Sequence, residues 1–284
     1  MNQDLENLEK IRKAALLNRI TKYALCYVLP LLIGILVGTS NDDFLMGAGC
    51  FVFPCMFLTT LWAKLAKNRS LAEYRSTYKK VLIESALNGG TLYEEMEFEY
   101  DAGFQPALIF KSGLFNTDKY YSDCYLSGVS DGVKFMQADV RNLRTGQNGT
   151  SLEYDGTFLA FPTSLPDATQ TNIYHKDADV CVLVMSKEFK IGNEGFDSMF
   201  KVNSSQPDKA RALINDDFIR RLLDLQNRTG KRIVMTVKQG WVYAFWPNKK
   251  SVLKPNLFKK YDSSMNSAIL KELSIAQEFI QAFK

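Results

Sequence analysis

Residues 23–63 decide the fold, and they read YALCYVLPLLIGILVGTSNDDFLMGAGCFVFPCMFLTTLWA. Two runs within this stretch, residues 23–40 and 44–63, contain no charged side chain, and only an Asn-Asp-Asp tripeptide separates them. Each run approaches the roughly 20 apolar residues that a helix needs to cross a bilayer core of about 30 Å. The stretch therefore predicts two membrane-spanning helices joined by a very short loop.

Both predicted spans carry residues that shape helix packing. Pro30 and Pro54 fall at similar depth in an antiparallel hairpin, and each removes one helical hydrogen bond, which favours a kink. Gly34 and Gly38 have the four-residue spacing that lets helices approach closely. We interpret these four residues as packing positions within the hairpin. The alternatives are a homo-oligomer built through the same face and a conducting pore, although neither span has a charged side chain to line one.

The distribution of charge predicts the orientation. The net charge of +4 is concentrated beside the spans, because residues 1–22 carry +2, residues 64–80 carry +5 and residues 81–284 carry −1. Lys and Arg thus flank the outer ends of both spans and are absent from the loop between them. By the positive-inside rule, we expect a multi-pass protein of the inner membrane with both termini in the cytoplasm. The near-neutral large domain argues against nucleic-acid binding.

The periodicity of the remaining sequence predicts four parts and an α+β fold. An amphipathic cytoplasmic helix is expected over residues 1–20, the transmembrane hairpin over 21–64 and a stalk helix over 65–88. Residues 89–284 are expected to form a cytoplasmic α+β domain in which a mostly antiparallel sheet packs with two or three helices.

Turn and cap residues place the elements of this domain. Asp131-Gly132 and Gly240 lie between apolar runs and predict two hairpins, while Asn215 and Gly230 predict the start and end of a helix. The polar, glycine-containing segment 141–150 is interpreted as a mobile loop and segment 162–176 as a loop or edge segment. The expected strands are 95–100, 121–126, 133–140, 156–162, 180–186, 200–202, 232–237 and 241–246. The expected helices are 207–214, 215–225 and 262–283, with a short helix or turn over 106–115.

Short motifs in this domain resemble a known family. They are Ser112-Gly113-Leu114-Phe115, Tyr121-Ser122-Asp123, Leu126-Ser127-Gly128, Phe200-Lys201-Val202, Asp208-Lys209-Ala210-Arg211 and Lys254-Pro255-Asn256-Leu257-Phe258-Lys259. Their order and spacing resemble the uncharacterised bacterial membrane-anchored family catalogued as DUF3137, over most of residues 60–260. The resemblance implies a membrane-anchored cytoplasmic domain and no established activity or cofactor.

Two sets of residues are candidates for contact with a protein partner. Ser112, Gly113, Leu114 and Phe115 form a compact apolar motif, and Trp246 precedes a proline at the end of an aromatic strand. Either set would serve as a partner-binding surface if it is exposed. The alternative is that Leu114 and Phe115 anchor a packed turn and that the aromatic strand belongs to the core.

The sequence contains little that indicates catalysis. His175 is the only histidine and lies beside charged residues, which is typical of a solvated position, and no Cys-x-x-Cys pair occurs. Asp123, Asp131 and Asp139 lie around one hairpin and would suit a hard cation if they converge, although a turn explains Asp131. We therefore expect no metal and no cofactor.

These observations lead to three hypotheses of different classes. The first is a membrane-anchored, non-enzymatic binding or scaffold protein that presents its cytoplasmic α+β domain, through a sheet edge, to a protein partner. The second is an oligomeric membrane effector or channel-like protein. The third is a metal-dependent enzyme that uses Asp123 and Asp139. All three share membrane lipids as a partner.

Overall fold

The computed structural model describes residues 2–41, 44–65, 69–87, 92–99, 101–115, 119–146, 149–166, 170–178, 188–247, 256–262 and 265–284. The chain divides into two compact units. The first comprises Met1–Ser85 and Leu253–Asn266, and the second comprises Ala86–Val252 and Ser267–Lys284. A segment from near the carboxyl end of the chain therefore belongs with the amino-terminal helices.

The first unit is built from helices. They are α1 (Asn2–Tyr23), a π-helical turn η1 (Ala24–Val28), α2 (Leu29–Asn41), α3 (Phe44–Leu65) and α4 (Arg69–Leu87). The first three form one continuous helix, Gln3–Ser40, which is long and apolar enough to cross a membrane, and Ala48–Leu61 is a shorter apolar helix. Among the described residues, one helix thus meets the length of a span, and the two-span hairpin stays a prediction.

The π-helical turn has a local cause in Pro30. The Leu29 N–H donates to the carbonyl of Ala24, five residues back, whereas Pro30 has no N–H to give to Cys26. A wider turn next to a proline accommodates this missing bond without ending the helix.

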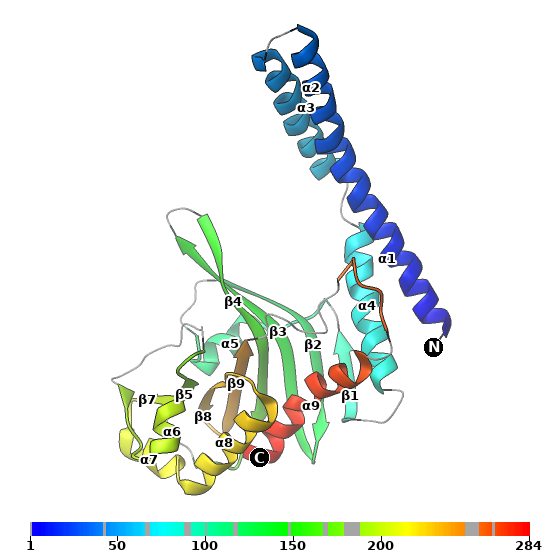
Figure 1. The fold of residues 1–284 in the computed structure, drawn as a ribbon. Helices are drawn as coiled ribbons and strands as arrows, with labels where there is room; N and C mark the ends of the chain where they lie inside the picture. The colour runs from blue at the N-terminus through cyan, green and yellow to red at the C-terminus, as the bar shows by residue number, and fades with distance from the viewer. Residues whose placement is uncertain are drawn as a thin grey trace. The chain divides into compact units, whose positions relative to one another are not determined.

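One stripe of the continuous helix is buried, and its residues recur every four positions. Cys26, Pro30 and Gly34 are buried and Gly38 is half-buried, and α2 lies alongside α3 (Figure 1), where Pro54 is half-buried. Small residues and a proline ring leave room for a neighbouring helix. Of the four packing positions predicted from the sequence, Pro30, Gly34 and Gly38 share this stripe of the long helix and Pro54 lies in α3, and their packing in a membrane stays a prediction.

The second unit contains a nine-stranded antiparallel sheet in the order β1-β2-β3-β4-β9-β8-β5-β7-β6, which confirms the α+β fold class. The strands are β1 (Glu94–Glu99), β2 (Lys119–Ser130), β3 (Val133–Gly146), β4 (Gly149–Pro162), β5 (Thr171–His175), β6 (Glu188–Phe189), β7 (Phe200–Ser204), β8 (Val234–Lys238) and β9 (Trp241–Pro247). The helices are α5 (Pro106–Ser112), α6 (Glu194–Met199), α7 (Pro207–Leu213), α8 (Asp216–Thr229) and α9 (Asn266–Phe283).

The predicted turns and caps are confirmed. Asp131 and Gly132, between β2 and β3, and Gln239 and Gly240, between β8 and β9, all have positive φ, as the tight turns of twisted hairpins require. The side chain of Asn215 accepts a hydrogen bond from Phe218 N at the start of α8, and Gly230 ends that helix in the left-handed conformation. These positions therefore fix the register of two hairpins and the ends of one helix.

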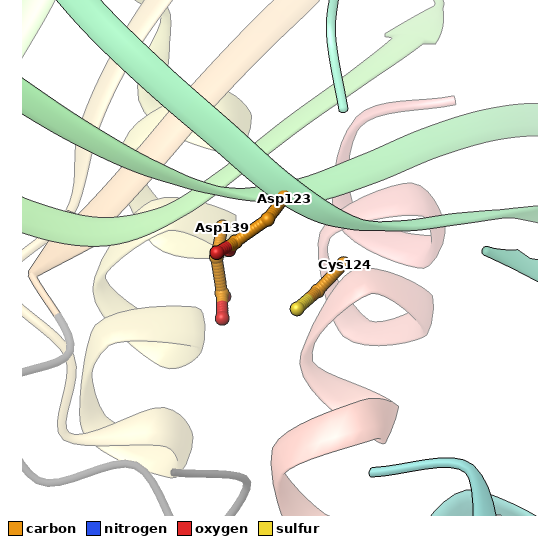
Figure 2. Close-up of side chains that lie close together, drawn as sticks. All are labelled: Asp123, Cys124 and Asp139. Atoms are coloured by element: carbon orange, nitrogen blue, oxygen red, sulfur yellow. The ribbon is translucent and has the colours of Figure 1, made fainter. Parts of the chain in front are cut away.

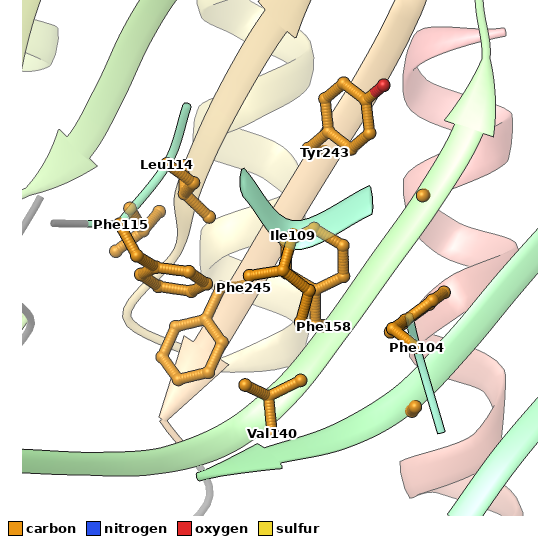
Figure 3. Close-up of a cluster of buried hydrophobic side chains, with 11 residues drawn as sticks. Phe104, Ile109, Leu114, Phe115, Val140, Phe158, Tyr243 and Phe245 are labelled. Carbon is orange, nitrogen blue, oxygen red and sulfur yellow. The ribbon is translucent and has the colours of Figure 1, made fainter. Parts of the chain in front are cut away.

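The sheet has a different cover on each face. On one face, α5 and its flanking residues pack on β3, β4, β8 and β9 (Figure 3), with Phe115 edge-on to Phe245 at 5.0 Å and Phe104 edge-on to Phe158 at 5.2 Å. On the other face, the ring of Phe279 in α9 stacks on Trp246 of β9 at 5.3 Å. Alternate residues of the same strands therefore reach two cores.

Two predicted loops are wrong. Segment 141–150 is largely strand, because β3 and β4 continue as a pair from Leu143↔Leu152 to Gly146↔Gly149. Segment 162–176 contains β5, which lies inside the sheet between β8 and β7. Polar composition suggested loops at both places, but backbone pairing satisfies such segments as well as water does. The strand predicted over 180–186 lies outside the described residues.

Candidate functional site

The sheet brings two carboxylates and a thiol together on β2 and β3. Asp123 and Asp139 face each other as register partners, and the ligand atoms of Asp123, Cys124 and Asp139 all lie within 4.8 Å of one another. Figure 2 shows the two carboxylates and the sulfur gathered beneath the crossing of the two strands. This is the one group of potential metal ligands found among the described residues. We call it the Asp–Cys–Asp cluster.

A β-bulge explains how neighbouring residues of one strand reach the same place. The register shifts between Asp123 and Leu126, so that two residues of β2 oppose one residue of β3, and Cys124 has φ +62°. In a regular strand, consecutive side chains point to opposite faces. The bulge turns Cys124 towards Asp139, and a residue other than glycine at positive φ costs about 1 kcal/mol or more.

A cationic side chain partly neutralises the negative charge of the cluster. Arg141 Nη2 lies 2.6 Å from Asp123 Oδ2, and Thr157 Oγ1 donates to Asp139 Oδ1 at 3.4 Å. Asp139 also fixes a neighbouring loop, because Ser122 Oγ donates to its carbonyl and accepts from Phe104 N. An ion pair and hydroxyl contacts of this kind suit a structural role as well as a cation site.

The cluster lies at one end of a row of paired residues that crosses β2, β3, β4 and β9. Asp139 pairs with Thr157 and Thr157 with Trp246, which is fully buried. The indole Nε1 of Trp246 has no hydrogen-bond acceptor among the described residues. The sequence predicts a partner contact for Trp246 only if its ring is exposed. The ring is buried because α9 covers it, so this prediction is wrong.

The other predicted partner motif is also inside the fold. Ser112, Gly113, Leu114 and Phe115 are all buried, and the Gly113 carbonyl accepts from Gln170 Nε2 at 3.0 Å. Gly113 has φ +66° and ends α5, which explains the glycine. The packed-turn alternative describes this motif, and it offers no surface to a partner.

Asp131 and His175 are not part of the cluster. Asp131 sits in the β2–β3 turn, where its carboxylate lies 3.5 Å from Lys284 Nζ. His175 ends β5 instead of lying in a loop, and its ring stacks edge-on against Phe200 at 5.5 Å. Its Nδ1 accepts from Asp177 N, and burial lowers the pKa of the imidazole. The geometry therefore gives His175 a structural role.

Sequence reasoning missed a second arrangement, in the first unit. A cavity of about 900 Å³ is lined by α1, α4 and residues 260–262. Beside it, Arg12 Nη1 donates to the Leu257 carbonyl at 2.5 Å, and Tyr74 OH donates to the Asn256 carbonyl at 3.3 Å. Residues 256–262 therefore form a strap that is hydrogen-bonded to α1 and to α4, and the motif at 254–259, noted above for a family resemblance, is the sequence signal that overlaps it.

The strap is held by charge as well as by packing. Arg12 forms two hydrogen bonds of 2.8 Å to Glu9, and these bonds lower the pKa of the Glu9 carboxyl. Leu257 and Leu8 are buried. Burial raises the pKa of the Tyr74 hydroxyl to about 12, so this phenol is neutral under physiological conditions.

The carboxyl-terminal part of the chain matches a family model. Residues 163–284 match the family model described as "Protein of unknown function (DUF3137)". The match confirms the resemblance over these residues, and the motifs at 112–128 lie outside it. Neither the curated proteins nor the solved structures compared with the chain gave a match.

Proposed function

With residues 163–284 assigned to the DUF3137 family, whose description gives no function, we propose that the chain is a membrane-anchored, non-enzymatic binding or scaffold protein. The segments η1, α2 and α3 of its helical unit cross the inner membrane, and its α+β unit faces the cytoplasm, where it binds a protein partner.

Exposed apolar surface is the observation that supports the proposed membrane anchor. Along η1, α2 and α3, large apolar side chains point outward, including Leu36, Leu45, Phe53 and Phe57, each of which is at least 67% exposed. Only 17% of the most apolar window of Gln3–Ser40 is buried. Apolar surface costs about 25 cal/mol per Å² in water, and contiguous exposed patches of this extent mark membrane or protein contacts. Lipid covers such a surface without any further folding.

Fractionation tests the anchor and its orientation. We expect the full chain to stay in the membrane pellet after carbonate washing. Protease should remove the α+β unit from inverted vesicles and leave it intact in sealed right-side-out vesicles. Release by carbonate, or cleavage in right-side-out vesicles, would overturn the proposal.

The partner surface is supported by the free edge of the sheet. β1 is one of the two outermost strands of the sheet, and its four glutamates, Glu94, Glu95, Glu97 and Glu99, are exposed. Charged edges resist self-pairing, while an open strand can accept an added strand from a partner. This edge therefore favours a partner segment rich in Lys and Arg.

Crosslinking in native membranes tests this surface. Glu95→Lys with Glu97→Lys should abolish a crosslinked partner that the wild type captures, while Glu194→Lys, at an exposed site of α6, should not. Equal capture by all three proteins would exclude the β1 edge as the binding surface.

The oligomeric effector is supported by the small-residue stripe of the first unit, because Gly38 is half-buried and lies two residues after Leu36, which is 67% exposed. It predicts a defined oligomer in detergent and ion flux in liposomes. A monomer without flux would remove it.

The Asp–Cys–Asp cluster favours a metal-dependent enzyme as the other candidate, because two carboxylates and a thiol can bind Zn²⁺. It ranks lower because Arg141 already neutralises Asp123. The hypothesis requires stoichiometric Zn²⁺ binding by the full chain, lost in Asp123→Asn with Asp139→Asn and retained in Asp208→Asn with Asp224→Asn. Equal binding by both double variants would reject it.

A further inference from the structure

The strap carries an aromatic side chain that packing does not explain. Phe258 is 71% exposed, whereas Leu257 beside it is 5% exposed. Both belong to the family's closing motif, and two lysines, Lys259 and Lys260, follow directly and are exposed. A turn that buries a leucine and displays a phenylalanine beside two cations resembles an interfacial contact more than a core element.

The conformation of the strap fixes the display of Phe258. Asn256 Oδ1 accepts from Phe258 N at 2.9 Å, and the Asn256 carbonyl accepts from Lys259 N at 3.3 Å. These two bonds close a tight turn. The backbone carbonyls of Asn256 and Leu257 are bound by Tyr74 and Arg12, so the strap is attached through its main chain, and the side chain of Phe258 is left outside.

The level of Phe258 along α1 is set by Arg19. The guanidinium carbon of Arg19 lies 5.6 Å from the ring centroid of Phe258 and 5.8 Å from that of Tyr23. Tyr23 is the first residue of the charge-free run, and it lies about 6 Å along the helix axis from Arg19. Phe258 is therefore held at the level where α1 changes from charged to apolar.

We infer that Phe258, Lys259 and Lys260 form a second contact with the cytoplasmic face of the bilayer, in which the Phe258 ring enters the boundary between headgroups and acyl chains and the two lysines bind anionic lipid headgroups. Aromatic rings and cations concentrate at this depth of a membrane. The inference rests on the proposed membrane anchor, because the strap reaches lipid only if α1 enters the bilayer near Tyr23.

Lipid photocrosslinking tests the contact in the full chain. Phe258 is replaced by the photoreactive p-benzoylphenylalanine, and the protein is reconstituted into vesicles of phosphatidylcholine mixed with phosphatidylglycerol. We expect lipid adducts at position 258, with phosphatidylglycerol enriched over its share of the vesicle. Each lysine should contribute about a fivefold preference, so Lys259→Gln with Lys260→Gln should bring the adducts back to the lipid ratio of the vesicle. Lys176→Gln with Lys209→Gln, at exposed sites, should leave the enrichment unchanged.

A second probe position separates the two proposals. Phe53 of α3 is 75% exposed and should form lipid adducts if the anchor is correct, and Tyr121 of β2, 61% exposed, supplies an aromatic position in the other unit as a reference. Adducts at 53 without adducts at 258, or adducts at 258 no more frequent than at 121, would overturn the strap contact alone. Absence of adducts at 53 would overturn the anchor and the strap contact together.

Discussion

Gly156 lies where β4 passes directly against β9. A Cβ at this position would lie 2.3 Å from the Trp246 carbonyl and 2.5 Å from Cζ of Phe245, and both belong to the packed interior. Gly156→Ala should therefore lower the free energy of unfolding by about 1 to 3 kcal/mol, as overpacked cores do. Gly195→Ala, where the nearest atom to the added Cβ is at 3.5 Å, is the matched control and should change it by less than about 0.5 kcal/mol. Denaturant titration of the full chain in detergent measures both, and equal midpoints would contradict the expected clash.

Tyr74 links the stability of the first unit to alkaline pH. Its pKa is about 12 in the folded state because burial disfavours the phenolate, compared with about 10 in an unfolded chain. The folded state therefore binds the proton more tightly. The stabilisation of the folded state by the proton on Tyr74 is fully present below pH 10. It decreases between pH 10 and pH 12 and is lost above the folded pKa.

The prediction at Tyr74 is tested by tyrosine absorbance. The difference between wild type and Tyr74→Phe should titrate near pH 12 in the folded protein and near pH 10 after unfolding. Tyr121→Phe, which removes an exposed phenol, provides the comparison. A difference titration of Tyr74 near pH 10 in the folded protein would show that the hydroxyl is not buried.

At the scale of elements, α8 shows what a cap contributes. The Asn215 side chain accepts from Phe218 N at 2.9 Å, which satisfies one of the unpaired N–H groups at the helix start. Asn215→Ala should cost about 1 kcal/mol of stability. Asn227→Ala, at an exposed position within the same helix, should cost nothing, because alanine has the higher helix propensity. A thermal unfolding shift for the first variant no larger than for the second would contradict the role of the cap.

Local sequence determines some of the helices and strands more fully than others. α8 and the two tight hairpins follow from caps, glycines and apolar periodicity, and these are local signals. β5 does not, because Thr171 and Asn172 are polar and yet fully buried. Their side chains bond to Ser204 and Thr236 of neighbouring strands, and partners so distant in sequence leave no local pattern. The sequence therefore predicts a loop or edge segment over residues 162–176 instead of an internal strand.

The candidate site shows the same division. The two-residue turn brings β2 and β3 together, but an uninterrupted ladder from Ser130↔Val133 would pair Asp123 with Val140, and the bulge between Asp123 and Leu126 shifts its partner to Asp139. The approach of Cys124 depends on a bulge with positive φ at a residue that is not glycine, and no turn signal marks it. The burial of Trp246 depends on α9, which packs on β9 from a distant part of the sequence.

At the scale of the whole molecule, two separate segments of the chain form the first unit. The helices α1 to α3 begin that unit, and residues 253–266 return to it before α9 completes the second unit. Because the first unit combines two segments that are distant in sequence, its integrity depends on contacts between residues far apart along the chain. Arg12 and Leu257, separated by 245 positions, make such a contact.

Arg12→Gln should therefore release the strap without disturbing the sheet. Loss of a hydrogen bond from a charged donor weakens the local structure by about 1.5 to 3 kcal/mol, so amide exchange of residues 256–260 should accelerate by about tenfold or more. Exchange in α8 should be unchanged, because that helix belongs to the other unit. Lys13→Gln, whose side chain is 71% exposed and 3.9 Å from Glu9, is the matched control and should leave the strap protected. If the strap exchanges equally fast in wild type and Arg12→Gln, the hydrogen bond between Arg12 and the Leu257 carbonyl does not hold it. If α8 accelerates as well, the two units unfold together, and the strap is part of a single cooperative structure.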